Sequence, residues 1–224
     1  MAAYIPSLGF CQSHVDDLLP QAIEIYSGDA RDLHLLDREV AAIDSLESST
    51  VDGLNFLSPG SRYVHFAGHG AGNGPPAERS LALGGEDITV PRILREADYV
   101  GVELVTLSAC STGAFSQESA APMELGGVDF ALIAVGAKCA VSTMWNVHDS
   151  ASALFMSALH AGLSIGNTIQ ASFINAQRLL RFGEGSPDVE VVLQRLWPRW
   201  QDEIMIDTRS AVHWGAFRLA GRYW

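Results

Sequence analysis

The chain has 224 residues, a length that suits one compact domain better than two. Apolar residues make up 48% of it, which is enough to bury a sizeable core. The formal net charge of −12, from 14 basic and 26 acidic residues, argues against nucleic acid or an anionic membrane as the partner and fits basic peptide segments. The acidic excess can also be a plain solubility feature, and composition does not separate these two interpretations.

The cysteines and the start of the chain bear on the cellular setting. Cys11, Cys110 and Cys139 are an odd number with no CxxC spacing, so we expect neither a disulfide scaffold nor a zinc site. No charged start followed by an apolar run opens the sequence, and no apolar stretch is as long as a membrane span. We therefore expect a soluble protein in the reducing cytoplasm, where a catalytic thiol survives.

In chain order, the first half alternates between short apolar runs and helical patterns. We predict strands at 4–10, 22–26 and 62–66, a helix at 33–46, and a short segment at 50–57. A loop at 70–76 leads to a hairpin at 80–83 and 87–90, and Pro91 opens a helix that ends near 97.

The second half continues the same alternation. We predict a strand at 102–107, a loop at 114–122, a helix at 123–136 and a strand at 138–143. Helices follow at 149–162, capped by Asp149 or Ser150, and at 167–182, then a linker at 183–188, a peripheral helix at 189–200 and a strand at 214–219. This order predicts an α/β fold in which helices sandwich a mainly parallel central sheet.

Two short motifs carry chemically reactive side chains: His65-Phe-Ala-Gly-His69-Gly70 and Leu107-Ser-Ala-Cys110-Ser-Thr-Gly113. Each follows a predicted parallel strand, and the carboxyl ends of such strands meet at the edge where open α/β sheets bind ligands. The glycines that flank His69 let the backbone turn sharply there. The imidazole would take the proton of Cys110 and make the thiolate, the reactive form of cysteine. We therefore predict a cysteine peptidase dyad of His69 and Cys110.

Other site chemistries fit the sequence less well. His65 and His69 have the spacing of a helical zinc pair, but glycines disfavour a helix there and no third ligand follows. The glycine-rich stretch 68–74 misses the GxGxxG pattern and runs into two prolines, so a dinucleotide site is not expected. We expect no metal and no cofactor. Cys139 is predicted to lie in the core and His65 to pack on the face of the sheet, and no chemical role is assigned to His65, Cys11, His160 or His213.

The segment Met144–Asp149 follows the strand at 138–143 and should reach the same edge of the sheet. Trp145 is either a wall of a substrate pocket or a packing residue. Asp149 is either the cap of the next helix, a frequent role for Asp, or the acid of a specificity pocket. The sequence leaves both pairs of alternatives open.

Four separated motifs resemble the CHAT domain, a caspase-like peptidase domain related to separases and often attached to TPR repeats. They are 64–70, 105–113, 140–149 and 214–217. Tyr4–Ser7 also resembles the start of the CHAT core, so the similarity extends over nearly the whole chain. The resemblance implies a caspase-hemoglobinase fold, a three-layer sandwich.

The resemblance also implies roles for individual residues. It assigns the dyad to His69 and Cys110, and an oxyanion hole to the backbone N–H groups of Gly70 and Cys110. Asp149 matches the separase-like acid that faces a basic side chain of the substrate, with Trp145 in the same motif.

We therefore predict that residues 1–224 form a single CHAT-type peptidase domain that cleaves a protein partner after a basic residue. No TPR repeat is visible, so we expect a domain excised from a longer protein, with a regulatory TPR region or activator outside this chain. The first alternative is a CHAT-like scaffold that binds a peptide or signalling partner without turnover, and the second is acyl transfer to a small molecule. The stretch 183–207 is either a surface helix or a docking face.

Overall fold

The computed structural model describes residues 23–27, 33–46, 49–50, 56–71, 79–83, 85–109 and 127–222. The strand predicted at 4–10, Cys11 and Cys110 lie outside these residues, as do the predicted loop at 114–122 and most of the glycine-rich stretch after His69.

A six-stranded sheet forms the centre of the fold, in the order β2-β1-β3-β7-β8-β9. Its strands are β1 (Ile23–Ser27), β2 (Ser49–Thr50), β3 (Tyr63–Ala67), β7 (Leu104–Ser108), β8 (Cys139–Thr143) and β9 (Phe217–Gly221). All neighbours pair in parallel except β8 and β9, which are antiparallel. The predicted mainly parallel sheet is confirmed, and β3, β7 and β8 end at one common edge.

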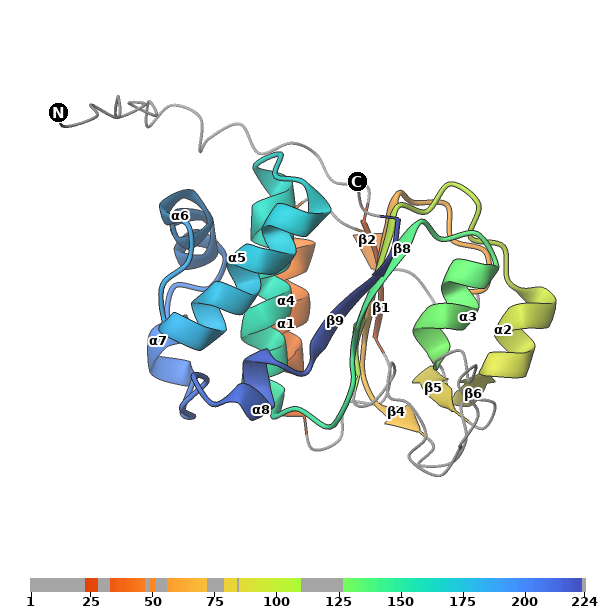
Figure 1. The fold of residues 1–224 in the computed structure, drawn as a ribbon, viewed down its shortest axis with the longest axis horizontal. Coiled ribbons are helices and arrows are strands. Elements are labelled where there is room, and N and C mark those ends of the chain that lie inside the picture. Colours follow the sequence, from red (N-terminus) through yellow and green to blue (C-terminus); the bar gives the residue numbers. More distant parts are fainter. Residues whose placement is uncertain are drawn as a thin grey trace, which may run out of the picture.

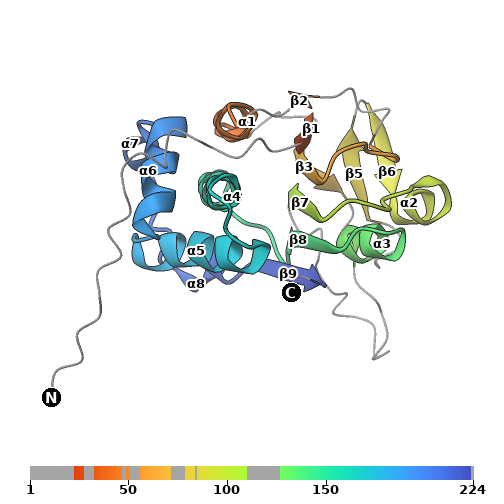
Figure 2. The same cartoon turned by 90° about the horizontal axis from the view of Figure 1, so that it is seen from above.

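Helices cover one face of this sheet, and helices with a small second sheet cover the other (Figure 1). On the first face lie α1 (Leu36–Asp44), α4 (Asp149–Ser164), α5 (Ile169–Phe182), α6 (Pro187–Leu196), α7 (Trp200–Glu203) and α8 (Ala211–Trp214). On the second face lie α2 (Val90–Glu96), α3 (Val128–Ala134) and the sheet β4 (Gly70–Ala71), β5 (Ser80–Leu83) and β6 (Glu86–Thr89). Figure 2 shows the two layers on opposite sides of the central strands.

Helix α4 runs between the sheet and the outer helices and is buried over nearly its whole length (Figure 2). Small residues such as Ala153, Ala158 and Ala161 are fully buried on it, which lets the neighbouring elements approach closely. The helix ends after Ser164, two residues beyond the predicted end. Because α4 begins at the end of β8, this packing fixes what its first turn presents at the edge of the sheet.

Several predicted boundaries are corrected by the structure. The predicted strand 214–219 begins only at Phe217, because residues 211–214 form the short helix α8. Thr168, rather than Asn167, caps α5 through a hydrogen bond from the backbone N–H of Ala171. The predicted helix at 189–200 is two helices, α6 and α7, separated by the irregular backbone at Trp197. The predicted hairpin and the Pro91 helix are confirmed.

Candidate active site

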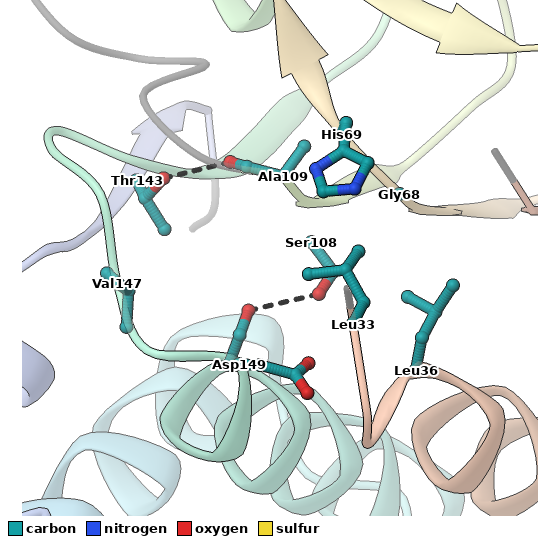
Figure 3. Close-up of a pocket in the computed structure, with 10 residues that line it drawn as sticks. Leu33, Leu36, Gly68, His69, Ser108, Ala109, Thr143, Val147 and Asp149 are labelled. Atoms are coloured by element: carbon teal, nitrogen blue, oxygen red, sulfur yellow. Dashed lines mark hydrogen bonds between the residues drawn. The ribbon is translucent and has the colours of Figure 1, made fainter. Parts of the chain in front are cut away.

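A small pocket opens at the carboxyl edge of β3, β7 and β8, and its volume is about 30 Å³. Its lining comes from elements far apart in the sequence (Figure 3): Leu33, Leu36, Gly68, His69, Ser108, Ala109, Thr143, Val147, Asp149 and Ser152. In Figure 3, His69 and Asp149 approach the pocket from opposite sides. The predicted histidine and the predicted acid therefore share one pocket.

His69 follows the last residue of β3 by two positions and is half-buried. The backbone around it is held from both sides. The N–H of Gly68 donates to the carbonyl of Ser108 over 3.1 Å, and the carbonyl of His69 accepts from the N–H of Ala82 over 3.1 Å. His69 thus sits where the central sheet and the small sheet meet, on a backbone tied to both.

The N–H of Gly70, the predicted oxyanion donor, is not used by the small sheet. Gly70 stands opposite Leu81 in the antiparallel pair of β4 and β5. The bond between Ala82 and His69 marks the neighbouring positions as the hydrogen-bonded pair, so Gly70 and Leu81 form a non-hydrogen-bonded pair. The N–H of Gly70 therefore points away from β5, as an oxyanion donor would need.

The end of β7 is fixed by side-chain hydrogen bonds. The Ser108 hydroxyl donates to Oε2 of Glu39 over 2.9 Å and lies 3.0 Å from the hydroxyl of Ser152. The hydroxyl of Thr143 donates to the carbonyl of Ala109 over 2.9 Å. These two anchored residues directly precede Cys110, the predicted nucleophile, which lies outside the described residues.

Asp149 is the first residue of α4, but its carboxylate does not cap that helix. The cap residue is His148, whose Nδ1 accepts from the N–H of Ser150 over 3.2 Å, so capping by Asp149 or Ser150 was a wrong prediction. Oδ2 of Asp149 instead accepts from the N–H of Leu35 over 2.7 Å and so binds the amino end of α1. A carboxylate near that end is favoured by the helix dipole. Asp149 thus ties α1 to α4 and lines the pocket.

Trp145 is 38% exposed, and its Nε1–H donates to the carbonyl of Val212 over 2.8 Å. It contacts the region of α8 and is not among the side chains that line the described pocket. Its role as a substrate-binding residue stays a prediction. Cys139 is buried in β8, as predicted, and burial raises the pKa of its thiol to about 12, so this thiol stays protonated.

Sequence reasoning missed a group of polar side chains buried between the sheet, α1 and α4. This buried polar cluster consists of Glu39, His65, Thr106, Ser108 and His160, and the half-buried Ser152 adjoins it. Nδ1 of His65 lies 2.8 Å from the Thr106 hydroxyl, which is 3.1 Å from Nε2 of His160. Nε2 of His65 lies 3.0 Å from Oε1 of Glu39. His65 was correctly expected on the sheet face, but nothing in the local sequence indicated its partners.

Burial sets the charge of this cluster. Loss of solvation raises the pKa of Glu39 to about 8, with a smaller contribution in the same direction from the negative charge of Asp149 and an opposing one from the Ser108 hydrogen bond. The same loss of solvation lowers the pKa of His65 to about 3 and lowers that of His160 well below its usual value. At neutral pH, Glu39 is therefore mainly a carboxylic acid and both imidazoles are neutral.

Two further features concern ligands and membranes. Among the described residues, no three His, Cys, Asp or Glu side chains gather as a metal would require. Within the same part of the chain, no helix combines the length and the apolar character needed to cross a bilayer.

Comparison with known protein families gives a match to the CHAT domain over residues 17–222. The chain belongs to the CHAT domain family. The resemblance of the four motifs is thereby confirmed, and the match covers the sheet, the helices on both faces and the pocket. A comparison with curated protein sequences finds no match to this CHAT domain.

Solved structures with a similar fold include caspase-like cysteine peptidases. The Arg-specific cysteine proteinase gingipain R (RgpB) superposes with a TM-score of 0.51 at 14% identity, over 80% of this chain and 46% of that one. A complex of the pro- and mature domains of Porphyromonas gingivalis RgpB gives 0.50 at 12% identity, over 94% of this chain and 49% of that one. The Saccharomyces cerevisiae separase–securin complex gives 0.49 at 14% identity, over 94% of this chain and 13% of that one.

This CHAT domain spans about half the length of the gingipain chains. At such low identities the likeness concerns the fold alone, and that fold is the caspase-like α/β architecture predicted from the sequence.

Proposed function

We propose that this CHAT domain is a cysteine endopeptidase that uses His69 and Cys110 as its dyad and cleaves a protein partner after a basic residue. The observation that carries the proposal is the register of β3 and β7. Tyr63 pairs with Leu104 and Ala67 pairs with Ser108, a constant offset of 41 positions. His69 comes two residues after the end of β3, and in the sequence Cys110 comes two residues after the end of β7.

Side-chain alternation supports the same pairing. Ser108 faces α1 and α4, where it contacts Glu39 and Ser152. Side chains two positions apart on a strand share a face, so His65 and Ala67 of β3 share the face of Thr106 and Ser108 of β7. Neighbouring strands lie about 4.8 Å apart, so chain segments that leave the ends of β3 and β7 start close enough for a histidine and a cysteine to exchange a proton. The N–H of Gly70, free of the small sheet, supports the oxyanion role.

The specificity part of the proposal rests on Asp149. It is a carboxylate in a narrow pocket that also holds His69. A guanidinium or ammonium group entering there would form a charge-assisted pair with it. The Arg specificity of gingipain R belongs to that protein, but it agrees with an acidic pocket on this fold. The net charge of −12 favours basic substrates as well.

The test is a digest of a peptide library by the full chain and by the Cys110→Ala variant, with cleavage products read by mass spectrometry. We expect products with Arg or Lys before the cleaved bond, and none from the variant. Cleavage that survives in Cys110→Ala would disprove the dyad. Absence of cleavage by the parent chain, with a partner protein supplied, would favour the scaffold alternative.

Asp149→Asn tests the specificity separately, on matched peptides with Arg or Leu before the cleaved bond. Asn keeps an oxygen that accepts from the N–H of Leu35 but removes the charge. Losing one partner of a desolvated pair costs about 3 kcal/mol, roughly a hundredfold in the preference for Arg at 1.36 kcal/mol per decade. An unchanged preference for Arg in this variant would overturn the assignment.

A further inference from the structure

The side chains that separate the pocket from Glu39 are two hydroxyls. Ser108 and Ser152 both line the pocket, and Ser108 donates to Oε2 of Glu39 behind it. Glu39 itself is fully buried and does not line the pocket. A second acidic side chain therefore lies one hydroxyl deeper than the pocket that holds Asp149.

The protons of the cluster form one consistent arrangement when Glu39 is neutral. Oε1 of Glu39 and Nε2 of His65 have no other hydrogen-bonding partner among the described side chains, so a proton on Glu39 is what joins them. His65 then donates from Nδ1 to Thr106. Thr106 in turn donates to His160, whose Nε2 at 3.1 Å is closer than the Val64 carbonyl at 3.3 Å.

The same side chains also accommodate an ionised Glu39. With the other tautomer of each imidazole, His160 donates to Thr106, Thr106 donates to Nδ1 of His65, and Nε2 of His65 donates to the carboxylate. Ser108 donates to Oε2 in both states. Both arrangements keep the contacts that join Glu39, His65, Thr106 and His160, and in both the single Thr106 proton points to an imidazole and not to the Val64 carbonyl.

The titratable groups around Glu39 are His65 from β3 and Asp149 and His160 from α4. Hydroxyls come from Thr106 and Ser108 on β7 and from Ser152 on α4. Asp149 is the one carboxylate among these groups, and its negative charge favours the protonated form of Glu39. A cation bound at Asp149 would cancel that influence.

We propose that Glu39 is a second acid of the specificity pocket and that a cationic side chain bound at Asp149 displaces its proton to solvent. This inference rests on the proposed function, because it needs a cation in the pocket. The empty pocket then carries one negative charge and the occupied pocket two. The empty site thereby avoids a second buried anion, which is costly. In the occupied site the second negative charge strengthens the preference for a cation over a neutral side chain.

The test counts the protons released on binding, by calorimetry in two buffers that differ in ionisation enthalpy. The ligand is N-acetyl-arginine amide, the neutral control is N-acetyl-citrulline amide, and the protein is the full chain with Cys110→Ala, which prevents turnover. Near pH 7.5 we expect net proton release with the arginine ligand and none with the citrulline control. Glu39→Gln should abolish this release, and its arginine affinity should lose its rise with pH.

A surface variant, Glu96→Gln on α2, is the matched control and should release protons as the parent does, because Glu96 is exposed and far from the pocket. If Glu39→Gln binds the arginine ligand and releases as many protons as the parent does, Glu39 is not the source of the protons. That result would overturn this inference and leave the proposed function standing. Equal binding of the arginine and citrulline ligands would instead overturn the basic specificity, and the inference with it. If Glu39→Gln fails to fold, difference infrared spectroscopy of the parent decides, since a bound cation must remove a protonated-carboxyl band.

Discussion

Both faces of the central sheet bury apolar side chains, but they differ in the groups that lie at the sheet surface near the pocket. Towards α2 and α3, the buried rings of Tyr26, Phe66 and Tyr99 surround Phe56 edge to face, with ring centroids 5.2 to 6.0 Å apart. Towards α1 and α4, the same strands bury the polar cluster under the pocket. The rings around Phe56 stabilise the fold by burying apolar surface. In the polar cluster, hydrogen bonds offset the cost of burying polar groups.

The two faces should therefore differ in how their contributions to stability depend on pH. Burial raises the pKa of the Tyr26 and Tyr99 hydroxyls beside Phe56, so the contribution of these rings to stability should change little between acidic and mildly alkaline pH. The buried carboxylate on this face, Asp129, lies apart from the rings and is paired with Arg218. The polar face carries an acid and two imidazoles whose pKa values all depart from their usual range. Substitutions on the two faces should therefore differ in their pH dependence as well as in size.

The largest expected effect is on turnover and comes from His69→Ala. If His69 is the base of the dyad, peptide cleavage should fall about 10⁴-fold, as when a unit of nucleophile and base is broken. The free energy of unfolding should change by about 1 kcal/mol at most, since His69 is only half-buried. Cleavage assays and thermal melts of the same preparation check both expectations. A variant that loses stability in proportion to activity would contradict a catalytic role.

On the apolar face, Phe56→Ala should lower the free energy of unfolding by about 3 to 5 kcal/mol. The ring is fully buried and contacts three other aromatic rings, so its removal leaves a cavity. Denaturant unfolding at pH 5, 7 and 9 should give a similar loss at each pH. A loss that changes strongly with pH would contradict the separation of the two faces.

On the polar face, Glu39→Gln should change how stability depends on pH. The folded-state pKa of Glu39, about 8, lies above the unfolded value near 4.5. The folded state therefore holds a proton that the unfolded chain loses, and stability falls by a few kcal/mol as pH rises from 4.5 to 8. Gln cannot ionise, so the variant should keep its stability over that range. Denaturant unfolding across the range measures it, and an equal fall with pH in both proteins would contradict the burial of a neutral acid.

The acid limb of the same profile should remain in Glu39→Gln. His65 has a folded-state pKa of about 3, below its usual value, so the unfolded chain binds the proton first and stability falls as pH drops from 6.5 towards 3. This retained limb is the internal control, because the burial that lowers the pKa of His65 remains in the variant.

Much of the fold could be predicted because its signals are local. The apolar runs before His69 and Cys110 are the strands β3 and β7, and Pro91 after Thr89 marks the start of α2. The edge position of His69 followed from the rule for parallel sheets. Helix α8 was missed because four residues are too few for a periodic signal, so Trp214 was assigned to the strand.

The contacts of the site could not be predicted, because they join residues far apart in the sequence. Glu39 bonds Ser108 across 69 positions, and Asp149 bonds Leu35 across 114. Within α1, Glu39 is one of several acidic residues, and nothing local distinguishes it from exposed Asp37. His148 is an unusual cap, and rules that favour Asp and Ser pointed to its neighbours.

The central claim, a thiolate at Cys110 made by His69 beside an acidic pocket, is tested most directly by covalent labelling. An arginine chloromethyl ketone and its leucine counterpart are reacted with the full chain, and the modified residue is identified by mass spectrometry. We expect labelling of Cys110 alone, much faster with the arginine reagent and slow in His69→Ala, while the buried thiol of Cys139 stays unmodified. Two results together would contradict a thiolate made by His69 beside an acidic pocket. The two reagents would label Cys110 at equal rates, and Cys110 would react no faster in the parent than in His69→Ala.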